Sequence, residues 1–194
     1  MERRDLRQKM LDIRKSLPSA EVNEASVEIC EAVRQLDIFK SAKKIATYAA
    51  RNGEINPSFI EPCADKKFLL PVVQENGLLE FMEPHGDLRK GRFGILEPVT
   101  GTVEKISEID LVFVPLVAAD PAGNRLGHGA GYYDKTFASD RISIRPPLVG
   151  LAYDFQIVKK LEINSWDVPL DILVTDSQVF FSEMSHSRVS LGEY

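Results

Sequence analysis

The sequence predicts a three-layer α/β/α sandwich with a mostly parallel, Rossmann-like central sheet and one antiparallel hairpin. Three observations predict this fold: two helical patterns open the chain, short β-branched apolar runs recur between helical or turn-rich segments, and a tight turn joins two of these runs. Strands that alternate with helices favour a parallel sheet covered on both faces. With 194 residues and 44% hydrophobic content, the chain can bury one sizeable core, so we expect a single domain over residues 1–194.

Two amphipathic helices are predicted at the start of the chain. Residues 2–16 carry an apolar stripe with helical spacing, and Pro18 ends the pattern. A second helix is predicted from Ser19, which we assign as its N-cap, to about Gln35. The apolar stripes of these helices consist of Leu6, Met10, Ile13 and Leu17 and of Val22, Ile29, Val33 and Leu36, respectively.

The remaining apolar runs predict the strands of the sheet. These strands span residues 44–50, 68–73, 78–82, 110–115, 148–152 and 172–175. A turn at 75–77 joins the second and third strands in an antiparallel hairpin. Short helical segments are predicted from Ser58 and over 157–161. The polar tail from about residue 184 is expected to be mobile.

Composition and charge exclude several classes of protein. Lys and Arg total 24 against 29 Asp and Glu, which gives a net charge of −5 and no basic half that would suit nucleic acid. Cys30 and Cys63 lack metal-binding spacing and are typical of reduced cytosolic thiols. Residues 1–17 resemble neither a secretory signal nor a membrane span, and the longest apolar stretch, 111–119, is about half of the ~20 residues that cross a bilayer. We therefore expect a cytoplasmic protein with no nucleic-acid or membrane partner, and a monomer by default.

The glycine-rich loop at residues 123–131 gives the strongest functional signal. It follows a predicted buried strand and leads into what resembles a helix, with glycines at alternate positions that let a ligand approach the backbone N–H groups. Arg125 suits phosphate oxygens, and Asp134 suits a magnesium ion. The loop matches neither a P-loop nor a dinucleotide fingerprint, and a flexible turn without a ligand is the alternative interpretation.

This loop makes the chain resemble a known family. The segment 124–134, Asn-Arg-Leu-Gly-His-Gly-Ala-Gly-Tyr-Tyr-Asp, is similar to the signature of the 5-formyltetrahydrofolate cyclo-ligases, also called methenyltetrahydrofolate synthetases. Further motifs in the same order extend the resemblance over nearly the whole chain. They are the segments 3–7 with Arg14, 53–55, 93–98 and 166–171. Several ordered motifs are much harder to obtain by chance than one.

The resemblance implies an enzyme that uses ATP and Mg²⁺ to close 5-formyltetrahydrofolate to 5,10-methenyltetrahydrofolate. It assigns ATP binding to Arg3, Arg4, Asp5, Leu6 and Arg7 and to Arg125, Leu126, Gly127, His128, Gly129, Ala130, Gly131, Tyr132 and Tyr133. It assigns folate binding to Ala49, Glu54, His128, Gly129, Ala130, Gly131 and Tyr132. It assigns the metal to Asp134 and Asp171.

The implied mechanism needs no covalent protein nucleophile, because the formyl oxygen attacks the γ-phosphate of ATP and N10 of the folate then closes the ring. The catalytic assignments are Arg125 for charge neutralisation and Tyr132 and Tyr133 for positioning, although these tyrosines equally fit packing roles. Arg7 is the preferred phosphate contact of the N-terminal run, with a solvated helix face as its alternative. For Glu54, the alternative is an exposed loop carboxylate.

Some positions depart from the family pattern or leave the function open. His128, Ala130 and Phe93 stand where relatives differ among themselves. A sugar-phosphate isomerase or an acyl-transfer enzyme would share the implied fold, and ATP dependence distinguishes it from a cyclo-ligase. A folate-binding protein without turnover is the third hypothesis, and the acids Asp134 and Asp171 argue against it because such a protein would have little use for a metal.

Overall fold

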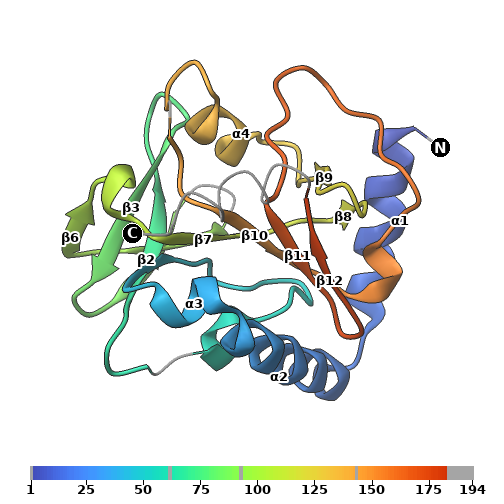
Figure 1. Cartoon of the computed structure of the whole chain (residues 1–194), viewed down its shortest axis with the longest axis horizontal. Helices are drawn as coiled ribbons and strands as arrows, with labels where there is room; N and C mark the ends of the chain where they lie inside the picture. Colours follow the sequence, from blue (N-terminus) through green and yellow to red (C-terminus); the bar gives the residue numbers. More distant parts are fainter. Residues whose placement is uncertain (1, 61–62, 92–93, 143, 183–194) are drawn as a thin grey trace.

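A mostly parallel sheet forms the middle layer of the structure, as the sequence predicts (Figure 1). The computed structural model describes residues 2–60, 63–91, 94–142 and 144–182. Within these ranges the central sheet has eight strands, in the order β12-β11-β10-β7-β1-β2-β3-β6. They are β1 (Lys44–Ala46), β2 (Lys67–Val73), β3 (Leu79–Pro84), β6 (Gly101–Glu104), β7 (Leu111–Val114), β10 (Leu148–Leu151), β11 (Ile172–Val174) and β12 (Val179–Phe181). The strands from β11 to β2 in this order run parallel, whereas β3, β6 and β12 are antiparallel to their neighbours.

Both predicted N-terminal helices are confirmed. The α-helices of the described residues are α1 (Arg3–Ser16), α2 (Ser19–Gln35), α3 (Asp37–Ser41) and α4 (Tyr132–Phe137). Ser19 is the first residue of its helix and not the N-cap, so that prediction is wrong. Pro18 takes the cap position because its backbone is extended and its carbonyl accepts the Val22 N–H at 3.1 Å. The short helix predicted from Ser58 is a single 3-10 turn, η1 (Pro57–Ile60).

Helices cover both faces of the sheet, which confirms the three-layer prediction. In Figure 1, α2 and α3 lie below the sheet and α4 lies above it. Alternating strand residues serve the two faces: Ile45 packs with the α2 side chains Ile29 and Val33, and the next residue, Ala46, belongs to the cluster that contains Phe137 of α4. Ile29 and Val33 are fully buried, and burying such a side chain contributes about 1.5–3 kcal/mol.

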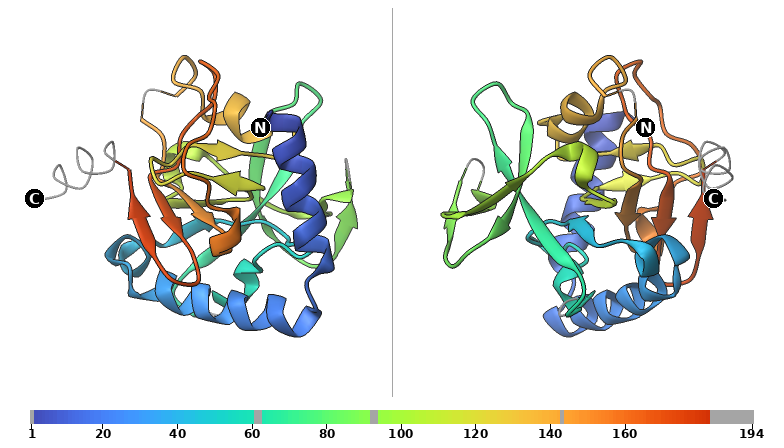
Figure 2. Two further views of the ribbon diagram at one scale, coloured as in Figure 1. Left: turned by 90° about the vertical axis from the view of Figure 1, so that its right-hand side faces the viewer. Right: turned by 60° about the vertical axis from the view of Figure 1, so that its left-hand side comes forward.

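Helix α1 stands at one side of the sheet, beside the glycine-rich loop (Figure 2, left). It packs on a two-stranded hairpin, β8 (Ala118–Ala119) and β9 (Arg125–Leu126), through a cluster that joins Leu6 and Met10 to Val117 and Leu126. This packing sets the α1 side chains Arg7 and Arg14 next to the loop, where they contact Gly127 and His128, respectively.

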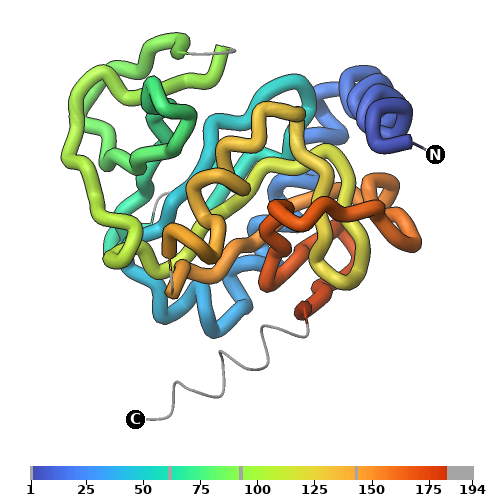
Figure 3. Tube along the Cα trace, turned by 90° about the horizontal axis from the view of Figure 1, so that it is seen from above, coloured from blue at the N-terminus to red at the C-terminus, as the bar shows by residue number. Residues whose placement is uncertain are grey.

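The opposite side of the molecule is formed by the green segment that contains β3 to β6 (Figure 3). It includes a second small hairpin, β4 (Leu88–Lys90) and β5 (Leu96–Pro98). The predicted hairpin of β2 and β3 is confirmed, and β6 extends it at the edge of the sheet.

Two element predictions need correction. The predicted strand 44–50 ends at Ala46, where the chain leaves the sheet for a loop. The helical turn predicted at 157–161 is wrong, because the 3-10 turn lies earlier, at η4 (Asp154–Gln156). The following backbone is extended instead, since the Val158 N–H donates to the carbonyl of Ala119 at 2.9 Å and Ile157 forms a parallel bridge to the same residue.

Some predictions are not addressed by the described residues. Phe93 and the tail from residue 184 lie outside them. Within the part of the chain that the structure describes, no helix combines the length and apolar character that a membrane crossing requires.

Gly123→Ala is expected to destabilise the fold more than Gly77→Ala. A positive φ costs an ordinary residue about 1–2 kcal/mol, and both glycines have one, at +87° and +79°. Only at Gly123 would a Cβ also stand 2.5 Å from a backbone oxygen, that of Leu170, whereas the nearest atom at Gly77 is Nζ of Lys135 at 3.7 Å. Urea unfolding of both variants measures the difference, and equal losses of stability would contradict the backbone clash.

Candidate functional site

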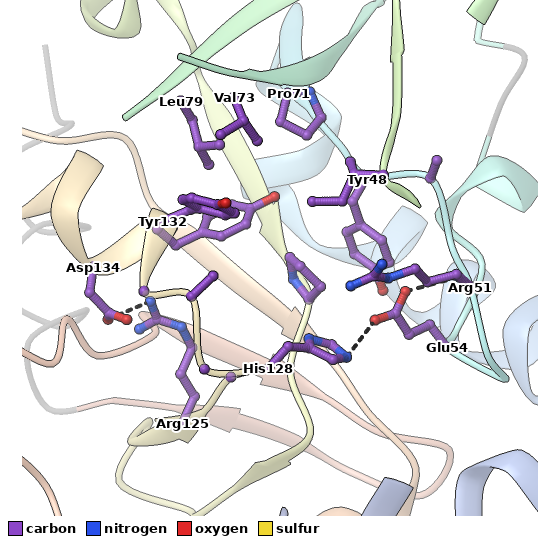
Figure 4. A pocket seen from close by; sticks show the side chains of 18 residues that line it. Tyr48, Arg51, Glu54, Pro71, Val73, Leu79, Arg125, His128, Tyr132 and Asp134 are labelled. Atoms are coloured by element: carbon purple, nitrogen blue, oxygen red, sulfur yellow. Dashed lines mark hydrogen bonds and ion pairs between the residues drawn. The ribbon is translucent and has the colours of Figure 1, made fainter. Parts of the chain in front are cut away.

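A cavity of about 410 Å³ lies at the carboxyl edge of the central sheet (Figure 4). Strands β1 and β7 end next to it, and residues that follow them, Tyr48 and Pro115, line it. The hairpin of β2 and β3 supplies an apolar wall of Pro71, Val73 and Leu79. We call this space the hairpin cavity. Ligands of open α/β sheets usually bind at this edge.

The glycine-rich loop separates the hairpin cavity from a second cavity of about 630 Å³. The residues that line both are Gly127, Gly129, Ala130, Gly131 and Asp134. The second space is lined by the basic residues Arg3, Arg7, Lys135 and Arg141 and by the acids Asp140 and Asp167, and we call it the arginine cavity. Gly129 and Gly131 have φ values of +108° and +66°, which a residue with a Cβ rarely adopts. A thin, glycine-built partition therefore lies between a largely apolar space and one lined by charged side chains, four of them basic.

Arg125 and Asp134 form an ion pair at this partition (Figure 4). Nη2 of Arg125 donates to Oδ1 of Asp134 at 2.7 Å, and Nη1 donates to the Val168 carbonyl. Burial lowers the pKa of Arg125, and attraction to Asp134 opposes this shift. The Asp134 oxygen also accepts the Val168 N–H at 3.1 Å, whereas no hydrogen bond of Oδ2 is seen within the described residues. The pair therefore presents one free carboxylate oxygen beside the loop.

A second charged cluster joins α1 to the hairpin cavity. Oε1 of Glu54 lies 3.5 Å from Nη2 of Arg14 and 3.1 Å from Nε2 of His128. Oε2 of Glu54 accepts the backbone N–H of Arg51 at 2.9 Å. Arg14 is 1% exposed, and burial lowers its pKa while Glu54 raises it. The cluster fixes the carboxylate of Glu54 and the ring of His128 on the wall of the cavity.

Tyr133 lines the same cavity, but its hydroxyl is buried. Its side-chain oxygen is buried and has no hydrogen-bond partner among the described residues. Burial, and secondly the negative charge of Glu54, raise its pKa above the ordinary value, so the hydroxyl stays protonated near neutral pH. Leaving such a buried hydroxyl unpaired costs about 1–3 kcal/mol.

Comparison with known proteins decides the family. Residues 1–176 match the model of the 5-formyltetrahydrofolate cyclo-ligase family. The chain belongs to this family. The 5-formyltetrahydrofolate cyclo-ligase of Haemophilus influenzae is 35% identical over 182 residues, which cover 89% of this chain and 97% of that protein. The enzyme of the same name from Escherichia coli K12 is 36% identical over 148 residues, or 72% of this chain and 81% of its relative.

Solved structures of cyclo-ligase relatives share the fold. The NMR structure of Aquifex aeolicus 5,10-methenyltetrahydrofolate synthetase superposes with a TM-score of 0.81 at 35% identity and covers 94% of both chains. The synthetase of Mycoplasma pneumoniae superposes with a TM-score of 0.73 at 25% identity and covers 91% of this chain and 99% of its own. The α/β fold and the ligase class of the family are therefore confirmed.

Most residues that the family resemblance assigns to ligands surround the two cavities. Those implied for the folate all line the hairpin cavity: Ala49, Glu54, His128, Gly129, Ala130, Gly131 and Tyr132. Those implied for ATP divide between the cavities, with Arg3 and Arg7 in the arginine cavity and Arg125, Tyr132 and Tyr133 in the hairpin cavity. The loop residues that line both connect the two sets.

Other residues implied for ATP do not reach the cyclo-ligase cavities. Arg4 and Asp5 are exposed on α1 and line neither space. Leu6 and Leu126 are buried in the core cluster beneath the loop. Leu6 and Leu126 therefore support the loop from below, and Arg4 and Asp5 face solvent.

Asp171, the second acid implied for the metal, does not share the cavity walls on which Asp134 lies. It is 3% exposed, lines neither cavity and pairs with the buried guanidinium of Arg145. Its Oδ2 also accepts the Leu148 N–H at 2.7 Å, and its Oδ1 lies 3.4 Å from Nη2 of Arg145. The structure therefore places only Asp134 at the cavities, and the oxygens of Asp171 bind protein donors instead.

Several residues of the cyclo-ligase site carry no assignment from the sequence. Tyr48 and Arg51 line the hairpin cavity, and Lys135, Arg141 and Trp166 line the arginine cavity. Apart from Lys135, which lies in the short helix α4, these are loop residues without a helical or strand period that would place them. A signal for Arg14 was present, since it follows Leu6 and Met10 at intervals of four on the apolar side of its helix, where a charge is unexpected.

Proposed function

We propose that this cyclo-ligase family member closes 5-formyltetrahydrofolate to 5,10-methenyltetrahydrofolate while ATP is converted to ADP and phosphate. The observation that carries the proposal is the glycine-built partition between the hairpin cavity and the arginine cavity. A reaction between a folate and the γ-phosphate of ATP requires two ligands that meet across a short distance. A partition with little side-chain bulk permits that meeting.

The hairpin cavity suits the folate. Its volume of about 410 Å³ lies within the range of small-molecule pockets, which is about 300–1,000 Å³, and its hairpin wall is apolar. A pterin presents a donor edge of amino and ring N–H groups, which a fixed carboxylate such as that of Glu54 accepts well. The Tyr133 hydroxyl, which is buried without a partner among the described residues, would offer a donor to the folate only after its side chain turned toward the cavity.

The arginine cavity suits the triphosphate. Nε of Arg7 donates to the Gly127 carbonyl at 2.8 Å, which holds the side chain against the loop, and no bond of its Nη atoms to described residues is seen. Lys135 and Arg141 add positive charge to the same space. Guanidinium groups bind phosphate oxygens in pairs, so these side chains would hold the phosphates beside the loop.

Asp134 is the residue that would hold Mg²⁺. The described residues contain no group of three or more His, Cys, Asp or Glu that could hold a metal by itself. Mg²⁺ is commonly bound through one or two carboxylates together with substrate phosphates, and the free oxygen of Asp134 at the border of both cavities fits that pattern. When bound, the ion would neutralise negative charge on the triphosphate.

The protein contributes alignment and charge neutralisation, because both nucleophiles belong to the folate. The formyl oxygen attacks the γ-phosphate and displaces ADP. N10 then attacks the activated carbon and loses its proton, and departure of phosphate gives the methenyl product. Glu54, held by Arg14 and the Arg51 N–H, orients the folate. Arg125 keeps a positive charge at the partition, where negative charge is transferred.

The test is to incubate the purified protein with 5-formyltetrahydrofolate, ATP and Mg²⁺ and to follow the absorbance of methenyltetrahydrofolate. We expect a signal that requires ATP and is largely lost in Asp134→Ala. Folate binding without turnover would instead support the inactive binding protein, and the absence of folate binding would contradict the proposed function. A cytoplasmic location and a monomeric state remain predictions.

A further inference from the structure

The arginine cavity contains an aromatic side chain that the chemistry described above does not use. Trp166 lines this cavity, is the single tryptophan of the chain and is 67% exposed. Indole is the largest apolar surface that a side chain offers, and leaving it exposed forgoes burial energy. Its place on the wall of a charged cavity, rather than on an open face, indicates a ligand with a flat surface.

The turn that carries Trp166 is tied by its own hydrogen bonds. The N–H of Asp167 donates to the carbonyl of Asn164 at 3.1 Å, and Oδ2 of Asp167 accepts the N–H of Asn164 at 2.8 Å. Trp166 lies between these two anchored residues. The turn, and with it the base of the indole side chain, is therefore held in one place.

Arg3 fastens this turn to α1. Its Nη1 atom lies 2.6 Å from Oδ2 of Asp167 and 2.6 Å from the carbonyl oxygen of Glu162. In Figure 1, the orange segment that follows η4 passes beside the N-terminal end of α1, in agreement with these contacts. The guanidinium of Arg3 thus binds acceptors of the protein itself, whereas Arg7, one turn further along the helix, faces the loop.

We propose that Trp166 stacks on the base of the nucleotide and that the ion pair of Arg3 with Asp167 positions it. This inference rests on the proposed function, since it names the site that holds the base of ATP. The phosphates lie along the loop with Arg7 and Lys135, and the base lies against the indole. Arg3, which the family resemblance assigns to ATP contact, is then a positioning residue that acts through the turn. Base stacking on an aromatic side chain is worth about 5- to 150-fold in affinity on alanine substitution.

The single tryptophan makes the wild-type protein its own probe. Titration with ATP is expected to change the emission of Trp166 and to saturate at the concentration range found by calorimetry. Inorganic tripolyphosphate, which has charge but no base, is expected to bind without the same change. Folate alone, with one or several glutamates, is expected to leave the emission unchanged, because its site is the hairpin cavity.

Variants separate stacking from other effects. Trp166→Ala is expected to raise the calorimetric Kd for ATP about 5- to 150-fold and to leave that for tripolyphosphate unchanged, while Trp166→Phe keeps most of the affinity. Arg3→Met is expected to weaken ATP binding as well, although less, and to shift the emission of the free protein. Lys9→Met removes a charge from an exposed position of the same helix and should change neither the Kd for ATP nor the emission of Trp166.

The outcomes distinguish this inference from the proposed function. If calorimetry showed ATP binding but the emission of Trp166 did not change, the stacking role would be overturned. The same holds if Trp166→Ala bound ATP as tightly as the wild-type protein. Neither result would contradict the cyclo-ligase activity. No ATP binding in the wild-type protein would overturn both. If Trp166→Ala weakened ATP binding and Arg3→Met did not, the positioning role of Arg3 would be overturned.

Discussion

Asp134→Asn is expected to lower kcat/KM for ATP by about 10²- to 10³-fold, whereas Asp171→Asn is expected to lower the free energy of unfolding by about 3–5 kcal/mol. The two acids are assigned the same role by the family resemblance, but their surroundings differ. Asp134 borders both cavities and is 25% exposed at its side chain. Asp171 is buried in a pair with Arg145, and removing one partner of such a pair leaves an uncompensated charge.

Stability and activity must be measured on both variants to separate these roles. Urea unfolding gives the free energy, and steady-state rates at several Mg²⁺ concentrations give the dependence on metal. Asp87→Asn, at an exposed position, is the matched control and should change neither. If Asp171→Asn kept full stability and lost the Mg²⁺ dependence instead, Asp171 would be a metal ligand and its pair with Arg145 would have to open during the reaction.

The periodic parts of the sequence predicted the scaffold well. The apolar stripes of α1 and α2 and the apolar runs that became β2, β7, β10 and β11 have lengths and patterns that few other structures satisfy. The short strands β8 and β9, two residues each, have no such pattern and form only because the chain folds back on itself. The extended segment at Ile157 depends in the same way on a distant partner, Ala119.

The candidate site was predicted where a contiguous motif carries it. The loop from Gly127 to Asp134 could be assigned from the sequence because its glycines and acid are adjacent in the chain. The two-cavity arrangement could not, since it depends on a hairpin, a helix and a turn that meet only in the fold. The environment of Asp171 could not be predicted either, because the motif contains the acid but not Arg145, which pairs with it.

Arg14→Met is expected to be the most destabilising single change in the site, at about 3–5 kcal/mol. The guanidinium donates to the carbonyls of Asn52 and Leu116 at 3.1 and 3.0 Å and lies against Glu54. Methionine fills similar space but leaves these carbonyls without a donor and a carboxylate, 6% exposed, without its counter-charge. Arg14→Lys should recover little, because one ammonium cannot reach all these acceptors. Arg89→Met, at an exposed position, is the matched control.

A double-mutant cycle with Glu54→Gln separates the charge pair from the carbonyl contacts. If the uncompensated carboxylate causes much of the loss, Arg14→Met should cost less in the Glu54→Gln background, with a coupling of about 0.5–3 kcal/mol from urea unfolding. If the stability losses of the two substitutions simply added, the result would contradict this and would assign the loss in Arg14→Met to the two unpaired carbonyls. In folded Arg14→Met protein we also expect weaker binding of both substrates, because α1 holds Glu54 through Arg14 and the loop through Arg7. Weaker binding of folate alone would show that the two ends of α1 act independently.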